Sequence, residues 1–154
     1  MTAALQDNAA AEILLADNLD LEALFYLDIL ASRQEDWKEN IEAAIPKLAG
    51  KPDAEVRIAA AYMAPGDEAN AVAHAEKIPN HPSGARTLGL ARQHEGRNEE
   101  ALKFFQKAAQ GAPTVAPFAL KPIDSLRRLG RHDEAMAMVE SQRTQSSDKP
   151  ELDF

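Results

Sequence analysis

The sequence predicts an all-α protein, and three observations support this fold class. Of the 154 residues, 45% are hydrophobic but only 5% are aromatic, and alanine supplies much of the apolar share. Such a composition favours closely packed helices over strands, which prefer β-branched and aromatic side chains. Apolar positions recur three and four residues apart, as in amphipathic helices. Glycine and proline interrupt these stretches at residues 50–52, 65–66, 79–82, 96, 111–117 and 130.

Composition also excludes several classes of function. The chain has no cysteine, which rules out disulfides, thiolate metal sites and cysteine nucleophiles. A formal net charge of −8 argues against binding to nucleic acid or to anionic membranes. No apolar stretch approaches the ~18 residues of a membrane span, and the first residues lack the basic segment of a secretion signal. We therefore expect a cytoplasmic protein, and we expect no cofactor.

The chain divides into three segments. We expect a leader helix in residues 1–19, a helical domain in residues 20–144 and a flexible tail in residues 145–154, which is polar and contains Pro150. Within the domain, residues 21–31 carry a wide apolar stripe that includes Phe25. Residues 98–110 carry a narrower stripe, and Asn98 is the expected N-cap of their helix.

Three segments of the domain, 58–75, 88–105 and 122–139, repeat one pattern. Each has a glycine at the same place, and each has an alanine five residues later. The glycines are Gly66, Gly96 and Gly130, and the alanines are Ala71, Ala101 and Ala135. A weaker copy, 27–44, has Glu35 in the place of the glycine. Repeats of this length predict stacked helical hairpins, each of which buries its apolar face against its neighbours.

The aligned segments resemble the tetratricopeptide repeat (TPR), a helix–turn–helix unit of about 34 residues. The best copy, 82–115, matches the family's pattern at Leu88, Gly89, Gly96, Ala101, Phe105, Ala108 and Pro113. The copy around Gly130 has Pro122 inside its first helix, so we expect this helix to kink or to start late. The resemblance implies a right-handed α-solenoid of about four antiparallel hairpins, whose first helices line a concave groove.

The resemblance also implies which side chains face this groove: Phe25, Ile29, Arg33, Val56, Ala60, Met63, Arg86, Leu90, Gln93, His94, Leu120, Asp124, Arg127 and Arg128. The groove then runs from apolar to basic. It suits a peptide in which an apolar stretch is followed by acidic residues, because arginine pairs well with carboxylates. Alternatively, the arginines only make the surface soluble. Some family members bind chaperone C-termini through a clamp that includes asparagine, but the asparagine slots here hold Ala60, Leu90 and Asp124.

Charge is unevenly distributed along the chain. Residues 1–42 hold ten acidic and two basic side chains, whereas residues 84–132 hold nine basic and four acidic ones. Two solvated faces would explain this pattern, but it also permits weak head-to-tail self-association, with charge setting the orientation. The last hairpin adds Met136, Met138 and Val139, which lack a polar helix beyond them. We therefore expect a weak homo-oligomer.

Catalysis has little support in the sequence. The histidines are His74, His81, His94 and His132, and no two of them have the i, i+4 spacing of a helical metal site. Motifs for a serine nucleophile, a phosphate loop and a dinucleotide are absent. The sequence therefore predicts a non-catalytic protein-binding adaptor or scaffold. The alternative is a small acidic chaperone of a bacterial secretion system, and a remote alternative is an enzyme that uses His74 or His94.

Overall fold

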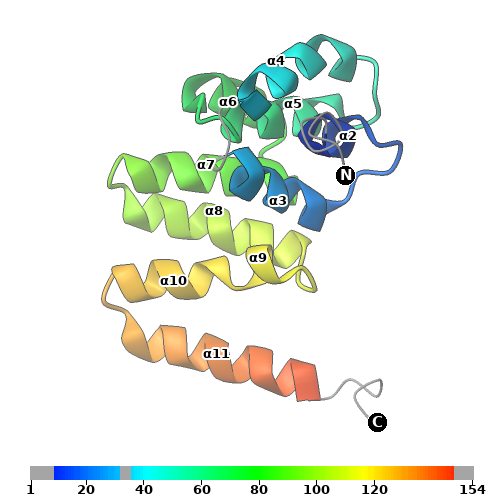
Figure 1. Ribbon diagram of the computed structural model, residues 1–154. Helices are drawn as coiled ribbons and strands as arrows, with labels where there is room; N and C mark the ends of the chain where they lie inside the picture. Colours follow the sequence, from blue (N-terminus) through cyan, green and yellow to red (C-terminus); the bar gives the residue numbers. More distant parts are fainter. Residues whose placement is uncertain (1–8, 32–35, 148–154) are drawn as a thin grey trace.

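The computed structural model describes residues 9–31 and 36–147, without the side chains of residues 28–31, 36–37 and 146–147. All regular secondary structure in these residues is α-helical, which confirms the predicted fold class. From residue 36 onward the helices stack one above another in chain order, as in a helical-repeat solenoid (Figure 1). None of the helices in the described residues is long and apolar enough to cross a lipid bilayer.

Three helical hairpins form the regular part of the stack: α5 (Ala54–Met63) with α6 (Glu68–Ala75), α7 (Pro82–His94) with α8 (Asn98–Gly111), and α10 (Lys121–Arg128) with α11 (His132–Ser147). The hairpins share their cores, because α6 packs on α7 and α8 packs on α10. Above them, α4 (Asp36–Leu48) packs on α5.

The predicted turn glycines all adopt the left-handed conformation, with φ of 91° at Gly66, 78° at Gly96 and 76° at Gly130. In each turn the amide after the glycine donates to a carbonyl five residues back, at distances of 2.9, 2.8 and 2.9 Å in chain order. This is the Schellman pattern, which ends a helix and reverses the chain. A side chain at these φ values would be strained, so the repeated glycine has a local physical cause.

The repeated alanines lie at the crossings of the hairpin helices, as the pattern predicts. Ala71, Ala101 and Ala135 are 0%, 1% and 7% exposed. Close approach is most evident at Gly89, where an added Cβ would lie 2.6 Å from Cε1 of the fully buried Phe105. The glycine of one helix and the aromatic ring of the next therefore pack as a pair.

Pro122 delays the start of its helix, which confirms the prediction. A four-residue helix, α9 (Ala116–Ala119), comes first, and α10 then begins at Lys121 with Pro122 in its first turn. Proline is tolerated there because the first amides of a helix have no partner within the helix. The break leaves Leu120 between the two helices, where it is 47% exposed.

Helix ends differ from the prediction in two places. Asn98 is the first helical residue of α8 and not its N-cap, which is Arg97. Helix α11 extends to Ser147, so the first three residues of the expected tail are helical, and residues 148–154 lie outside the described chain. On α11, Met136 and Val139 are exposed as expected, but Met138 packs against Leu102 and Leu126.

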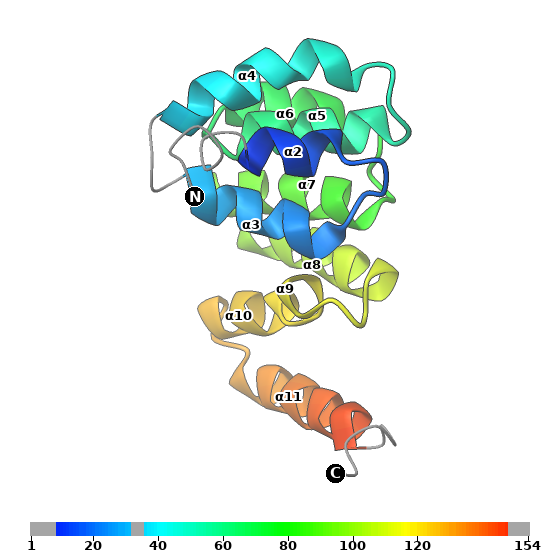
Figure 2. The same cartoon turned by 45° about the vertical axis from the view of Figure 1, so that its right-hand side comes forward.

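The largest difference lies in the first predicted hairpin, residues 27–44. Helix α3 (Leu21–Ala31) does not stack as the partner of α4, which packs mainly against α2 (Ala9–Leu15) and α5. Instead, α2 and α3 lie against one side of the stack, in front of α5 and α7 (Figure 2). Leu24 and Leu27 are buried in a core shared with α2, α4 and α5. The apolar residues of α3 cover most of its circumference, and such a helix is stable only when neighbours cover more than one side.

Candidate functional site

A cleft of about 410 Å³ opens where α3, α7, α9 and α10 meet. Its lining combines apolar and charged side chains: Phe25, Arg86, Ala116, Pro117, Leu120, Lys121 and Asp124. Four of these, Phe25, Arg86, Leu120 and Asp124, belong to the predicted groove. Beside the cleft, α10 begins at Lys121 with Pro122 in its first turn, and Phe118 of the preceding α9 packs in one cluster with Ala85 of α7.

Arg86 lies between the two apolar walls of this cleft. Its helix buries Ala85 and Leu88 in the core, which leaves Arg86 half-buried on the opposite side. The Cζ atom lies 5.4 Å from the ring centroid of Phe25, within the range of a cation–π interaction. Arg86 therefore links α7 to α3 and keeps its positive charge at the cleft.

Three cationic side chains surround Asp124 on α10. Arg127 Nη2 and Arg128 Nε donate to its carboxylate at 2.8 and 2.9 Å, and Lys121 Nζ lies 3.8 Å away. The spacings of three and four residues place all of them on one face of the helix. Because a single carboxylate serves three cations, this cluster beside the cleft carries an excess of positive charge.

The pKa values in the cluster reflect this arrangement. Burial lowers the pKa of Lys121, Asp124 partly opposes this shift, and the nearby charges of Arg86 and Arg128 add to it. Burial would raise the pKa of Asp124, but hydrogen bonds from Arg128 and Arg127 outweigh it and lower the pKa below its usual value of 3.8. Asp124 is therefore ionised at neutral pH. Its one negative charge is outnumbered by the three cations around it, so an incoming anion would meet a cationic site.

Above the cleft, α3 fills the groove formed by α5 and α7. A void of about 10 Å³ lies at this contact, and it is lined by Leu24, Phe25, Ala60, Met63, Ser83, Arg86, Thr87 and Phe118. Phe25 thus borders both the filled and the open part of the groove. The resemblance implied a place in the groove wall for the helix of Phe25, whereas in the structure this helix lies in the groove.

Five other predicted groove residues fall into three groups. Met63 lies in the filled part, beside Ala60. Val56 is only 2% exposed within the core shared by α2, α3, α4 and α5. The side chain of Ile29 and all of Arg33 lie outside the described residues.

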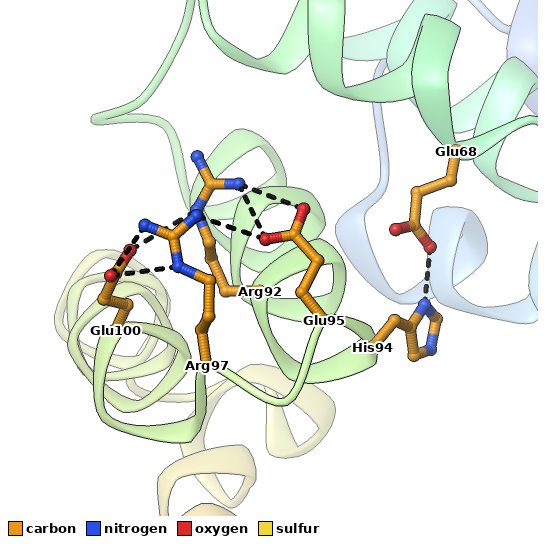
Figure 3. A network of polar contacts seen from close by, with 6 residues as sticks. All are labelled: Glu68, Arg92, His94, Glu95, Arg97 and Glu100. Carbon is orange, nitrogen blue, oxygen red and sulfur yellow. Dashed lines mark hydrogen bonds and ion pairs between the residues drawn. The ribbon is translucent and has the colours of Figure 1, made fainter.

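Leu90, Gln93 and His94 follow Arg86 along α7 and do not line the cleft. Leu90 and Gln93 are half-buried. His94 lies at the turn, where its Nδ1 is 2.5 Å from Glu68 Oε2 (Figure 3). The sequence analysis missed Lys121, although its spacing from Asp124 and Arg128 is a recognisable signal of a charged helix face.

The same turn carries a second charged cluster, which is balanced within itself. Arg97 Nη2 donates to Glu100 at 2.7 Å and its Nη1 donates to Glu95 at 3.2 Å, while Arg92 contacts both carboxylates (Figure 3). Two arginines and two glutamates neutralise one another here. The cluster therefore connects α7 to α8 and, unlike the cleft, carries no net positive charge.

The histidines that could support catalysis are engaged in structural contacts. His74 Nδ1 lies 2.5 Å from Glu55 Oε2, and the ring of His74 stacks on Tyr62 with centroids 5.6 Å apart. His81 is the N-cap of α7, where it accepts from the amide of Ser83, and burial lowers its pKa. Among the described residues, no group of three histidine or carboxylate side chains could hold a metal ion.

Comparison with known proteins gives a result at the level of the fold. No family model matches the chain, and no curated protein sequence matches it either. Among solved structures, MamA AMB-1 is similar, with a TM-score of 0.52 and 20% sequence identity over 93% of this chain and 82% of that one. At this identity the likeness concerns the fold alone. Together with the glycine turns and the alanine crossings, it supports a TPR-like helical repeat fold.

Proposed function

We propose that this protein is a non-catalytic scaffold that binds a segment of a protein partner in its groove. The observation that carries this proposal is the cleft itself, where the apolar Phe25 and Leu120 lie beside Arg86 and Lys121. Helical-repeat proteins in general use such inner surfaces to bind other proteins.

The chemistry of the cleft indicates the kind of segment. Large apolar side chains of a partner would pack on Phe25, Pro117 and Leu120, which lie on opposite sides of the opening. Aspartate or glutamate beside them would pair with Arg86 and with the cluster on α10, where the guanidinium groups favour two-point contact with carboxylates. A partner segment that combines apolar and acidic residues fits both features.

The test uses charge reversal with a matched control. Affinity purification with mass spectrometry first identifies candidate partners, and titration then measures their binding directly. The variant Arg86→Glu/Arg127→Glu/Arg128→Glu should abolish binding and leave the helical circular dichroism signal intact. The control Lys47→Glu/Lys103→Glu/Lys107→Glu makes the same change in charge at exposed positions of α4 and α8 and should bind normally.

Salt gives an independent readout. Binding to the cationic cleft should weaken as salt is added, because exposed charges are screened beyond ~10 Å at 0.1 M ionic strength. Equal loss of binding in both triple variants would assign the effect to overall charge. Binding that survives reversal at the cleft would place the partner on another surface and would refute the proposal.

A further inference from the structure

Helix α3 occupies the groove in the manner of a bound peptide. Leu24 and Leu27 enter the core formed with α2, α4 and α5, while Leu21 also packs against the neighbouring cluster of Ala85 and Phe118. Phe25 lies beneath Arg86 at the border of the open cleft. A single helix thus spans two layers of the stack with apolar anchors three and four residues apart, which is how an amphipathic helix binds in a groove.

Helix α2 is held in a different way. The fully buried Arg57 of α5 donates to the carbonyls of Leu14 and Ala16 at 2.7 and 2.6 Å, and Lys51 pairs with Asp17 at 3.5 Å. Directional hydrogen bonds therefore fix the end of α2 to the stack. The anchors of α3 among the described side chains, in contrast, are apolar, and the side chains of another apolar helix could replace them.

Helix α3 also carries its own N-cap. The side chain of Asp20 accepts from the amides of Glu22 and Ala23 at 2.9 and 3.4 Å. A cap of this kind satisfies the first amides of a helix within the segment itself. The N-terminal cap of α3 can therefore remain formed when the segment leaves the groove. The hydrogen bonds of Arg57 meanwhile hold the preceding residues in place.

From these observations we propose that α3 is a resident occupant of the groove and that a partner helix of matching chemistry displaces it. The inference rests on the proposed function, since it assigns the groove to a partner. Such a partner presents large apolar residues in the spacing of Leu21, Leu24 and Phe25, with the aromatic position under Arg86. An acidic residue beside the aromatic one reaches Lys121 and the cluster on α10.

Displacement follows from the available space. Leu24 and Leu27 of α3 are 5% and 0% exposed in the core that they share with the stack, so a second helix cannot reach the surface that they cover. The adjoining cleft of about 410 Å³ is open, and Phe25 forms one of its walls. Release of α3 from its Phe25 side therefore extends the open cleft into the groove, and a partner helix then takes its place, exchanging one set of apolar contacts for another.

The absence of cysteine allows a direct test in the full chain. Phe25→Cys and Ser83→Cys together place one thiol on α3 and one on α7 beside the same void, and they leave Arg86 in place. A short bismaleimide bridges them and locks α3, whereas a monofunctional maleimide caps them and leaves α3 free. A fluorescent peptide of residues 19–31 is the probe. It should bind the bridged protein at least about tenfold more weakly than the capped one, because locking removes the state that can bind.

The matched control places the same bridge elsewhere in the stack. Glu68→Cys and His94→Cys join α6 to α7, whose side chains meet there, and this bridge should not change binding of the probe. In the capped protein, the probe should also increase amide hydrogen exchange in α3. Equal binding to bridged and capped protein, or no binding to the capped protein, would overturn the proposal.

Two further outcomes separate the proposals from each other. A concentration-dependent dimer that disappears on bridging would identify the occupant as α3 of a second copy and would overturn the assignment to a different protein. The charge-reversal experiment measures partner binding without this probe. If charge reversal abolishes partner binding but the bridge between α3 and α7 does not change probe binding, the exchange of α3 is refuted. The groove would then still be the binding site.

Discussion

The guanidinium of Arg57 in α5 donates a hydrogen bond of 2.7 Å to the carbonyl of Leu14, which lies 43 residues earlier at the end of α2. Further bonds from the same side chain reach the carbonyls of Ala16 and Pro52, and Arg57 is 0% exposed. A cation suits this place because the C-terminal end of a helix carries partial negative charge. One buried side chain thus joins three separate segments of backbone.

Replacing Arg57 by methionine should therefore loosen α2. The variant keeps much of the apolar stem but leaves the buried carbonyl of Leu14 without its donor, at an expected cost of about 1–3 kcal/mol in the free energy of unfolding. Urea denaturation measures this cost, and hydrogen exchange should rise most in α2. Arg143→Met is the control, because that side chain is 77% exposed and its ion pair with Glu140 contributes little. Equal effects of the two substitutions would contradict a structural role for Arg57.

The contact of Gly89 with Phe105 gives a second prediction. Gly89→Ala should lower the melting temperature despite the better helix propensity of alanine, because the new Cβ would lie 2.6 Å from a ring that is fully buried. Overpacking of this kind costs about 1–3 kcal/mol. Gly50→Ala provides the comparison, since no atom lies within 4 Å of the position of its Cβ. A melting temperature that does not fall in Gly89→Ala would mean that α7 and α8 can move apart freely.

Sequence alone accounts well for features that depend on neighbouring residues. A left-handed turn depends on the conformation of one residue, and glycine adopts a positive φ without strain. The repeated Gly66, Gly96 and Gly130 therefore predict the positive φ that the structure has at each of these positions. The late start of α10 follows in the same way from Pro122, whose ring and missing amide act within one turn of helix.

Features that depend on distant packing were not predictable. The apolar residues of α3 extend around most of the helix, so their spacing does not say which side faces the stack, and the helix was assigned to the wrong layer. Arg57 interrupts an apolar stretch of α5, but its partners are backbone carbonyls, and carbonyls leave no mark in a sequence. Lys121 was not predicted because the family pattern assigns groove positions to its neighbours Leu120 and Asp124 and not to Lys121 itself.

Asp124 offers a third prediction, which concerns binding. Asp124→Asn removes the only carboxylate among the described residues that line the cleft. An acidic partner segment should then bind more tightly, by roughly fivefold, as expected for about 1 kcal/mol from one charge at 4 Å in water. Its affinity should also depend more steeply on salt. Calorimetric titration at two salt concentrations measures both effects, and weaker binding by the variant would show that Asp124 itself contacts the partner.

The same substitution should alter Lys121. Because the charge of Asp124 raises the pKa of this lysine against the effect of burial, the pKa should fall further in Asp124→Asn. NMR titration of the lysine side chain measures the change. An upward shift would mean that the lysine is more solvated in the variant than its position beside Phe105 implies.

Glu55 gives a prediction about acid stability. Its hydrogen bond with His74 lowers its pKa below the usual value of 4.5, and the charges of His74 and Lys77 add to this. A carboxyl group with a lowered pKa in the folded state stabilises the fold above its unfolded pKa and loses this effect as the pH falls through the folded value. Wild type should therefore lose stability below pH 4.5 more steeply than Glu55→Gln does. Urea denaturation across this range measures the difference, and parallel curves would contradict the prediction.

Because α3 fills the groove, the speed of partner binding has an upper limit. An empty groove binds at a rate proportional to partner concentration, whereas an occupied groove must first release its own helix. The observed association rate should therefore level off at high concentration, at a value that depends on this chain and is common to all its partners. Partners of different affinity would then differ in how long they remain bound, and much less in how fast they arrive.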